Sequence, residues 1–223
     1  TACPCCPRAA GHLEPGESPI ESRATWPRVA RDFSSDPAFL RGLEAVDRCG
    51  LSFDLQTNPH QLASFASSLS SLPVSFPVVL DHLGSLRGAV RVAPSSVGSA
   101  NDLVLDDEQI AVWRQGMEAM AELPNVHVKL SMLGYSAPVW WESGREAQRQ
   151  VLAGLVNEVV DLFGARRCMF ASNWPVDGED GLDAPNMFAH YWSWVSHREQ
   201  EELTRLFQGT AVEFYRLRGG GGD

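Results

Sequence analysis

A regular alternation of short apolar segments with amphipathic segments of helical period, beginning near Asp36, is the strongest constraint on the fold. Asp36 and Pro37 are typical of a helix start, and Gly50 marks the end of that helix. Strands are expected at 51–56, 77–82, 126–131 and 168–173, with helices between them. Parallel strands need such crossover helices, so the pattern predicts an α/β fold.

Local sequence features refine this outline. Residues 83–101 are rich in Gly, Ser and Ala and predict a long loop. Three Ser/Thr–Glu pairs have the spacing of a capping box and predict helix starts: Ser143–Glu146, Ser196–Glu199 and Thr210–Glu213.

The two ends of the chain differ from the segment between them. Residues 1–31 are rich in Pro, Gly, Ser and Glu without strand or helix period, and we expect a disordered tail. Residues 32–217 form the expected domain, and 218–223 a flexible glycine tail. Cys3, Cys5 and Cys6 are crowded in the first tail, but no second cysteine pair stands at metal-site spacing, so zinc there is not favoured.

Charge and hydropathy exclude several classes of protein. The chain carries 28 acidic and 18 basic residues, a net charge of −10, and no clustered basic segment. This disfavours a nucleic-acid partner or an anionic membrane surface. The sequence contains no run of about 18 apolar residues, which a membrane-spanning helix would need. We therefore expect a cytoplasmic protein.

Two predicted strands each carry a polar face. Side chains alternate across a strand, and a parallel sheet covered by helices is usually apolar on both faces. The polar positions are Ser52, Asp54 and Gln56 in one strand and His127, Lys129 and Ser131 in the other. These faces indicate a lumen or cleft, in which Asp54 and Lys129 either form a structural ion pair or bind substrate.

Polar residues also stand where the predicted strands end. Ligands of parallel α/β folds gather at the carboxyl ends of the strands, so His82, Ser131, Asn173 and Gln56 are expected at one rim. His60 follows the first strand closely and is expected to reach the same rim.

Four segments resemble successive motifs of one family: 50–55 (GLSFDL), 78–84 (VVLDHLG), 125–131 (NVHVKLS) and 169–176 (MFASNWPV). The family is the amidohydrolase-related TIM-barrel hydrolases, in the branch that contains L-fuconolactonase and 2-pyrone-4,6-dicarboxylate lactonase. The resemblance covers residues 32–217. It implies a TIM (β/α)8 barrel of which this chain holds the last four β/α units.

The resemblance also implies a reaction and roles for residues. It implies a hydrolase in which water attacks a lactone or similar carbonyl bond of a small, anionic substrate, with His82 facing the substrate. The family's eighth strand ends in an aspartate that acts as general base, and Asn173 stands there in this chain. A carboxamide cannot accept that proton, so we expect Asn173 to orient water or the carbonyl.

The remaining site residues follow from their places around these two. The expected substrate-binding residues are Asp54, Gln56, His60, Lys129, Ser131 and Trp174. Arg87 and Arg91 are further candidates for binding a substrate carboxylate, with solvated loop charges as the alternative.

The family's His-x-His pair has no match in this sequence. The complete family fold implies one divalent metal, zinc, with His82 as a candidate ligand. Two alternatives to the hydrolase stay open: a metal-dependent decarboxylase of the same superfamily, and a non-catalytic binding protein. Four strands do not close a barrel, so the expected partners are a complementary half-barrel or a second copy of the chain, besides the small-molecule substrate.

Overall fold

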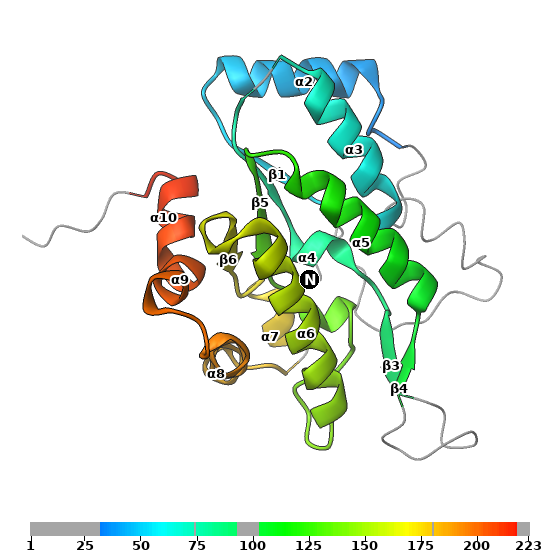
Figure 1. Ribbon diagram of the computed structural model, residues 1–223, viewed down its shortest axis with the longest axis vertical. Coiled ribbons are helices and arrows are strands. Elements are labelled where there is room, and N and C mark those ends of the chain that lie inside the picture. The colour runs from blue at the N-terminus through cyan, green and yellow to red at the C-terminus, as the bar shows by residue number, and fades with distance from the viewer. Residues whose placement is uncertain (1–31, 74, 93–102, 180, 218–223) are drawn as a thin grey trace, which may run out of the picture.

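The computed structural model describes residues 32–73, 75–92, 103–179 and 181–217 (Figure 1). Its helices are α2 (Pro37–Arg48), α3 (Pro59–Ser71), α4 (His82–Ser85), α5 (Asp107–Ala121), η1 (Leu133–Tyr135), α6 (Glu146–Phe163), η2 (Ala165–Arg167), α7 (Val176–Glu179), α8 (Ala184–Val195), α9 (Gln200–Thr204), η3 (Arg205–Gly209) and α10 (Thr210–Phe214). Its strands are β1 (Phe53–Leu55), β2 (Val78–Leu80), β3 (Val90–Val92), β4 (Leu103–Leu105), β5 (Val126–Leu130) and β6 (Cys168–Phe170). Our predictions for 1–31 and 218–223, including the cysteine cluster, lie outside the described residues. Of the described helices, none is both long and apolar enough to cross a membrane.

Four of the strands form one parallel sheet in the order β1-β2-β5-β6. Its register places Asp54 beside Val79 and Val79 beside His127, and Lys129 beside Met169. The predicted α/β fold and the four predicted strands are therefore confirmed, although most strands are shorter than expected. Leu51 lies outside β1 and is exposed rather than packed on its apolar face.

One face of the sheet packs against α3, α5 and α6 and forms the main core (Figure 1). Fully buried aliphatic side chains from the central strands point into it, among them Val78, Leu80 and Val128. Helices α3 and α5 pack so closely that a Cβ added to Gly116 would lie 2.5 Å from the Cβ of Leu62. Burial of these side chains, each contributing about 1.5–3 kcal/mol, holds the helices on this face.

The opposite face carries the C-terminal helix α10. Phe214 packs there with Val79 and Met169 in a separate small core, and its ring lies 5.0 Å from that of His127. The next residue, Tyr215, reaches Asp54 on β1. The face with polar positions is thus partly covered by the chain's own C-terminal segment.

The predicted long loop at 83–101 is wrong in part. It contains α4 and β3, and β3 pairs antiparallel with β4, forming a two-stranded sheet beside the main one. The capping boxes are also wrong, because Arg145 and Glu199 occupy the N-cap positions and neither side chain caps its helix. Thr210 lies within a continuous helical run and donates a hydrogen bond to the buried carbonyl of Ala165 instead.

Candidate active site

The carboxyl ends of β2, β5 and β6 bring His82, Ser131 and Asn173 to one end of the sheet. Helices α4 and α7, which follow β2 and β6, lie at the end away from α2 (Figure 1). Adjacent strands are about 4.8 Å apart, so β2 and β6, separated by β5, are about 10 Å apart. His82 and Asn173 thus follow strands that are separated by one strand, and the segment after β5 lies between them.

His82 is held by two neighbours from the segment after β5. Its Nδ1 lies 3.0 Å from the Oγ of Ser131, and its ring meets the ring of Tyr135 edge to face at 6.1 Å. Burial lowers the pKa of His82 below its ordinary value of 6.5, although the nearby Asp81 carboxylate opposes the shift. The imidazole is therefore neutral at pH 7 and has one donor and one acceptor nitrogen.

Several residues that follow the strands adopt left-handed backbone conformations. His82 has a φ of 57°, and Met132 and Asn173 have φ values of 50° and 51°. Such conformations are uncommon for residues other than glycine and are concentrated at functional sites in proteins. They turn the chain sharply just beyond each strand and direct these segments across the rim.

Asn173 is fixed by the helix that follows it. Its Nδ2 donates a hydrogen bond of 2.9 Å to Oδ1 of Asp177, a buried residue of α7. The peptide bond between Trp174 and Pro175 is cis, and the Trp174 ring lies against Gly178, where an added Cβ would clash with it. Trp174 is 56% exposed, which places a large apolar surface beside the rim.

A second polar cluster lies on the sheet face that α10 covers. The Nζ of Lys129 lies 2.5 Å from Oδ2 of Asp54 and 2.9 Å from Oδ1 of Asp81, and the hydroxyl of Tyr215 donates to Asp54 at 2.9 Å. Burial disfavours the ammonium, but hydrogen bonds to Asp54, Tyr215 and Asp81 outweigh burial and raise the pKa of Lys129 well above its usual range. Burial also raises the pKa of Tyr215 to about 12. The predicted ion pair is present, and the substrate-binding role of Asp54 and Lys129 stays a prediction.

The structure does not bring every predicted site residue together. Gln56 is exposed just after β1, and His60 is exposed in the first turn of α3; neither makes a described contact with His82. Three residues that the sequence did not indicate also belong to these clusters: Tyr135, Asp177 and Tyr215. Only Asp177 had a usable signal, because it stands four residues after Asn173 where a new helix begins.

A metal ion does not fit the side chains that the structure describes. Within 32–73, 75–92, 103–179 and 181–217, no three His, Cys, Asp or Glu side chains come together in a group that could hold one. His82 Nδ1 is engaged with Ser131, and Asp81 is engaged with Lys129. The zinc ion that the family resemblance implies therefore has no ligand set in this part of the chain.

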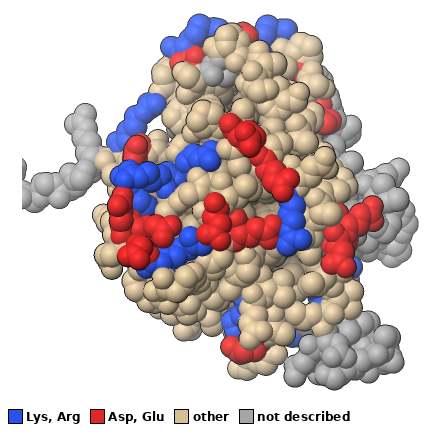
Figure 2. Space-filling view, viewed as in Figure 1, with Lys and Arg blue, Asp and Glu red and all other residues tan. Residues whose placement is uncertain are grey.

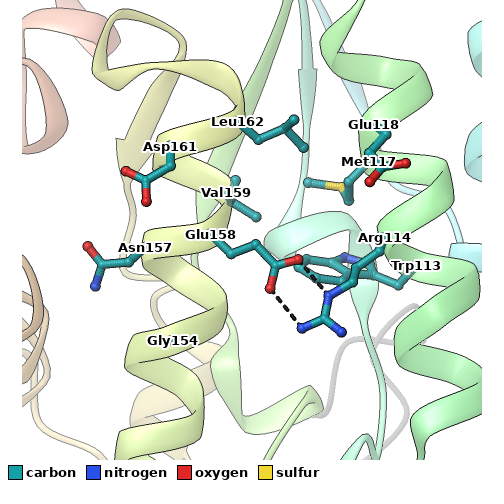
Figure 3. Close-up of a pocket in the computed structure, with 10 residues that line it drawn as sticks. All are labelled: Trp113, Arg114, Met117, Glu118, Gly154, Asn157, Glu158, Val159, Asp161 and Leu162. Atoms are coloured by element: carbon teal, nitrogen blue, oxygen red, sulfur yellow. Dashed lines mark hydrogen bonds and ion pairs between the residues drawn. The ribbon is translucent and has the colours of Figure 1, made fainter.

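A groove of about 530 Å³ lies elsewhere, between α5 and α6 (Figure 3). Its lining residues all come from these two helices, and Arg114 crosses it to form two hydrogen bonds with Glu158. The sheet separates this groove from the face that carries Lys129. Acidic and basic side chains are interspersed over the surface around it (Figure 2). We assign the candidate site to the rim. The residues that line the groove include no histidine and come from helices rather than from strand ends.

Comparisons with known proteins concern the family and the fold of the chain. A family model described as Amidohydrolase matches residues 23–217. The L-fucono-1,5-lactonase of Burkholderia ambifaria is 28% identical over 200 residues, which cover 86% of this chain and 59% of that protein. The chain thus spans about three fifths of the length of this relative.

Solved structures show the same relationship. An amidohydrolase from Burkholderia multivorans with bound zinc superposes with a TM-score of 0.68 at 26% identity, covering 83% of this chain and 60% of that one. A probable 2-pyrone-4,6-dicarboxylic acid hydrolase from Acinetobacter baumannii gives a TM-score of 0.60 at 15% identity, covering 81% of this chain and 58% of the other. At that identity the second likeness concerns the fold alone.

Proposed function

Because the chain belongs to the amidohydrolase family, with its α/β TIM-barrel fold, we propose that it contributes to a hydrolase that adds water to the carbonyl of a small lactone. The observation that carries this proposal is the arrangement of His82 with Ser131 and Tyr135 at the strand ends. The likeness to an L-fucono-1,5-lactonase supports a sugar-derived 1,5-lactone as substrate.

In this proposal the neutral His82 polarises the lactone carbonyl. When the Ser131 hydroxyl donates to Nδ1, the ring proton resides on Nε2, which then donates to the carbonyl oxygen. Tyr135 holds the other side of the ring. A donor aimed at the oxygen on which negative charge develops is worth about 3–4 kcal/mol in transition-state stabilisation.

Asn173 places the attacking water, and neighbouring residues enclose the substrate. The amide cannot take the proton of that water, so Asn173 acts through hydrogen bonds alone. Trp174 gives the substrate an apolar wall, and Gln56 and His60 extend the opposite side of the rim. Asp54 and Lys129 lie below the rim and support it through Asp81, the residue before His82.

An anionic substituent on the substrate is part of the proposal. The guanidinium of Arg87 stacks over the Tyr135 ring at 4.8 Å, and the same ring contacts His82. Arg87 and His82 therefore contact the same ring, and Arg87 is the residue proposed to bind a substrate carboxylate. Arg91, whose Nε donates to the Gly88 carbonyl, is directed back onto its own turn.

The proposal extends to the partners of the chain. Among the strands of the described sheet, β1 and β6 are paired on one edge only. Such edges fit further β/α units from a complementary half-barrel or from a second copy. Zinc is not part of this proposal, because the described side chains offer no ligand set for it.

The test is lactone hydrolysis by the full-length protein that carries this chain. L-fucono-1,5-lactone and a panel of lactones with and without a carboxylate are incubated, and acid release is followed with a pH indicator. We expect hydrolysis of at least one lactone, a loss of 100-fold or more in H82Q, and no change in the matched control H197A, whose histidine is exposed in the turn between α8 and α9.

Two results would contradict the proposal. Hydrolysis of every lactone at the same rate in H82Q and the parent protein would remove His82 from the reaction. Saturable binding of a lactone without turnover would favour the non-catalytic alternative, in which Asn173 and His82 only bind.

A further inference from the structure

The side chain of Asn173 is held in one of its two amide orientations by a buried carboxylate. Nδ2 of Asn173 donates to Oδ1 of Asp177 at 2.9 Å, and Asp177 is 8% exposed. An ionised carboxylate only accepts hydrogen bonds. If the amide rotated by 180°, Oδ1 of Asn173 would face a carboxylate oxygen, and two acceptors would meet in a site poorly reached by water.

Asp177 itself is fixed by its surroundings. Its backbone N–H points to the Asn173 carbonyl, and its own carbonyl accepts from the Leu182 N–H at 3.3 Å. Burial raises the pKa of Tyr191, and the Asp177 carboxylate adds to that shift. The carboxylate therefore lies near Tyr191, a buried residue of α8. The backbone of Asp177, whose carboxylate orients Asn173, is therefore held in place by hydrogen bonds to Asn173 and Leu182.

The amide oxygen of Asn173, Oδ1, can accept a hydrogen bond from a ligand. No described residue donates to Oδ1 of Asn173, and this oxygen is not among the buried polar atoms without a partner. Asn173 is only partly buried, so Oδ1 meets solvent. An acceptor oxygen is what an attacking water needs from the residue that places it, because that water presents its own O–H.

We propose that Asp177 is a positioning residue: it fixes the amide of Asn173 so that Oδ1, and not Nδ2, is presented to the water that attacks the substrate. This inference rests on the proposed hydrolase function for its consequence in catalysis. The orientation of the amide can be measured without any substrate.

The chain offers a matched control. In the exposed first turn of α8, Nδ2 of Asn186 donates to Oδ2 of Asp183 at 2.5 Å. This pair has the same chemistry as Asn173 and Asp177 but is surrounded by water. It shows what an Asn–Asp contact does when burial does not enforce it.

The first measurement is hydrogen exchange of side-chain amides by NMR, with asparagine labelled with ¹⁵N. We expect the Asn173 NH₂ group to exchange at least tenfold more slowly than that of Asn186. D177N should reduce this protection, because an amide at position 177 can turn either its oxygen or its N–H toward Asn173 and no longer enforces one orientation, whereas D183N should leave Asn173 unchanged. Equal exchange at the two sites, or protection of Asn173 that is undiminished in D177N, overturns the inference.

A second variant keeps the test informative if D177N does not fold. N173D sets two carboxylates about 3 Å apart, and such pairs share a proton. We expect a ¹³C titration of N173D to give one apparent carboxyl pKa more than one unit above the ordinary value of about 3.9. Titration of both carboxyls near 3.9 would show that Asp177 does not face position 173.

The kinetic measurement separates this inference from the proposed function. In an active protein, D177N should lower kcat about 10- to 100-fold and leave KM within threefold, because water is misplaced while the lactone still binds. An unchanged kcat overturns the positioning role. If no lactone is hydrolysed but D177N still releases the amide, the proposed function fails and the orienting contact stands.

Discussion

Replacing Lys129 with methionine should destabilise the fold more than the loss of any surface ion pair. Lys129 is 18% exposed, and its ammonium lies between Asp81, at 15% exposure, and Asp54, at 40%. Methionine preserves most of the aliphatic stem and removes only the charge. The variant K129M therefore leaves two carboxylates facing each other without a cation.

The magnitude follows from the distances and the exposure. At 2.9 Å and an effective dielectric of about 20, the gross attraction of Lys129 to Asp81 is about 6 kcal/mol, most of which offsets the desolvation of both groups. Solvent screens the exposed pair with Asp54 to about 1 kcal/mol or less. Leaving Asp81 buried and unpaired costs about 2–3 kcal/mol, so the total loss in K129M is about 2–4 kcal/mol.

Urea denaturation followed by circular dichroism measures this loss. R114M is the matched control, because Arg114 and Glu158 form a two-point ion pair at 51% and 36% exposure, and its removal should cost about 0–1 kcal/mol. The double variant K129M/D81N should recover about half of the loss.

The contribution of Lys129 to the stability of the wild-type chain should not change with pH near neutrality. Its raised pKa keeps the stabilisation present below the unfolded value of about 10.4, and it is lost only at higher pH. A cost in K129M no greater than in R114M would refute the reasoning.

Three further predictions concern packing, titration and reactivity. G116A should lose about 2–3 kcal/mol because its Cβ overlaps the facing leucine of α3, whereas G154A, with open space around its Cβ, should gain up to about 1 kcal/mol in urea denaturation. NMR should show His82 titrating below 6.5; its contribution to stability is present above pH 6.5, is lost as the pH falls through the folded pKa, and should be absent in H82Q. Cys168, whose thiol pKa burial raises to about 12, should resist iodoacetamide in the native protein while exposed Cys49 reacts, as read by mass spectrometry.

Where a single period governs a segment, the sequence was enough to predict the structure. The alternation in 126–131 separated Val126, Val128 and Leu130 from His127 and Lys129, and the first three are fully buried under the helices. The same alternation placed Lys129 and Asp54 on polar faces, where an ion pair was one of two predicted roles, and the pair is present. Period alone decides the face of a strand, because a shift by one residue would bury every charge.

Contacts that depend on neighbours in space could not be predicted this way. β3 pairs with β4 across the segment 93–102, and neither three-residue strand has enough length to show a period. Ser143 had the spacing of a helix cap, yet α6 begins later, at Glu146. The same limit applies to the candidate site. The sequence indicated His82 by its place at a strand end, but it did not indicate Tyr135, because the contact of Tyr135 with His82 depends on the turn after β5.

The position of α10 has a physical reason that local sequence does not contain. The sheet face opposite the main core has polar positions on β1 and β5, but Val79 and Met169 place apolar side chains on the same face. Water in contact with those two side chains is costly, so the face needs an amphipathic cover rather than a polar one. The consecutive residues Phe214 and Tyr215 provide it. The ring of Phe214 packs on Val79 and Met169, and the hydroxyl of Tyr215 donates a hydrogen bond to Asp54. Residues 210–214 could form a helix on either face of the sheet, so helix propensity does not decide where α10 lies. This face is preferred because it offers apolar side chains to Phe214 and a carboxylate to Tyr215.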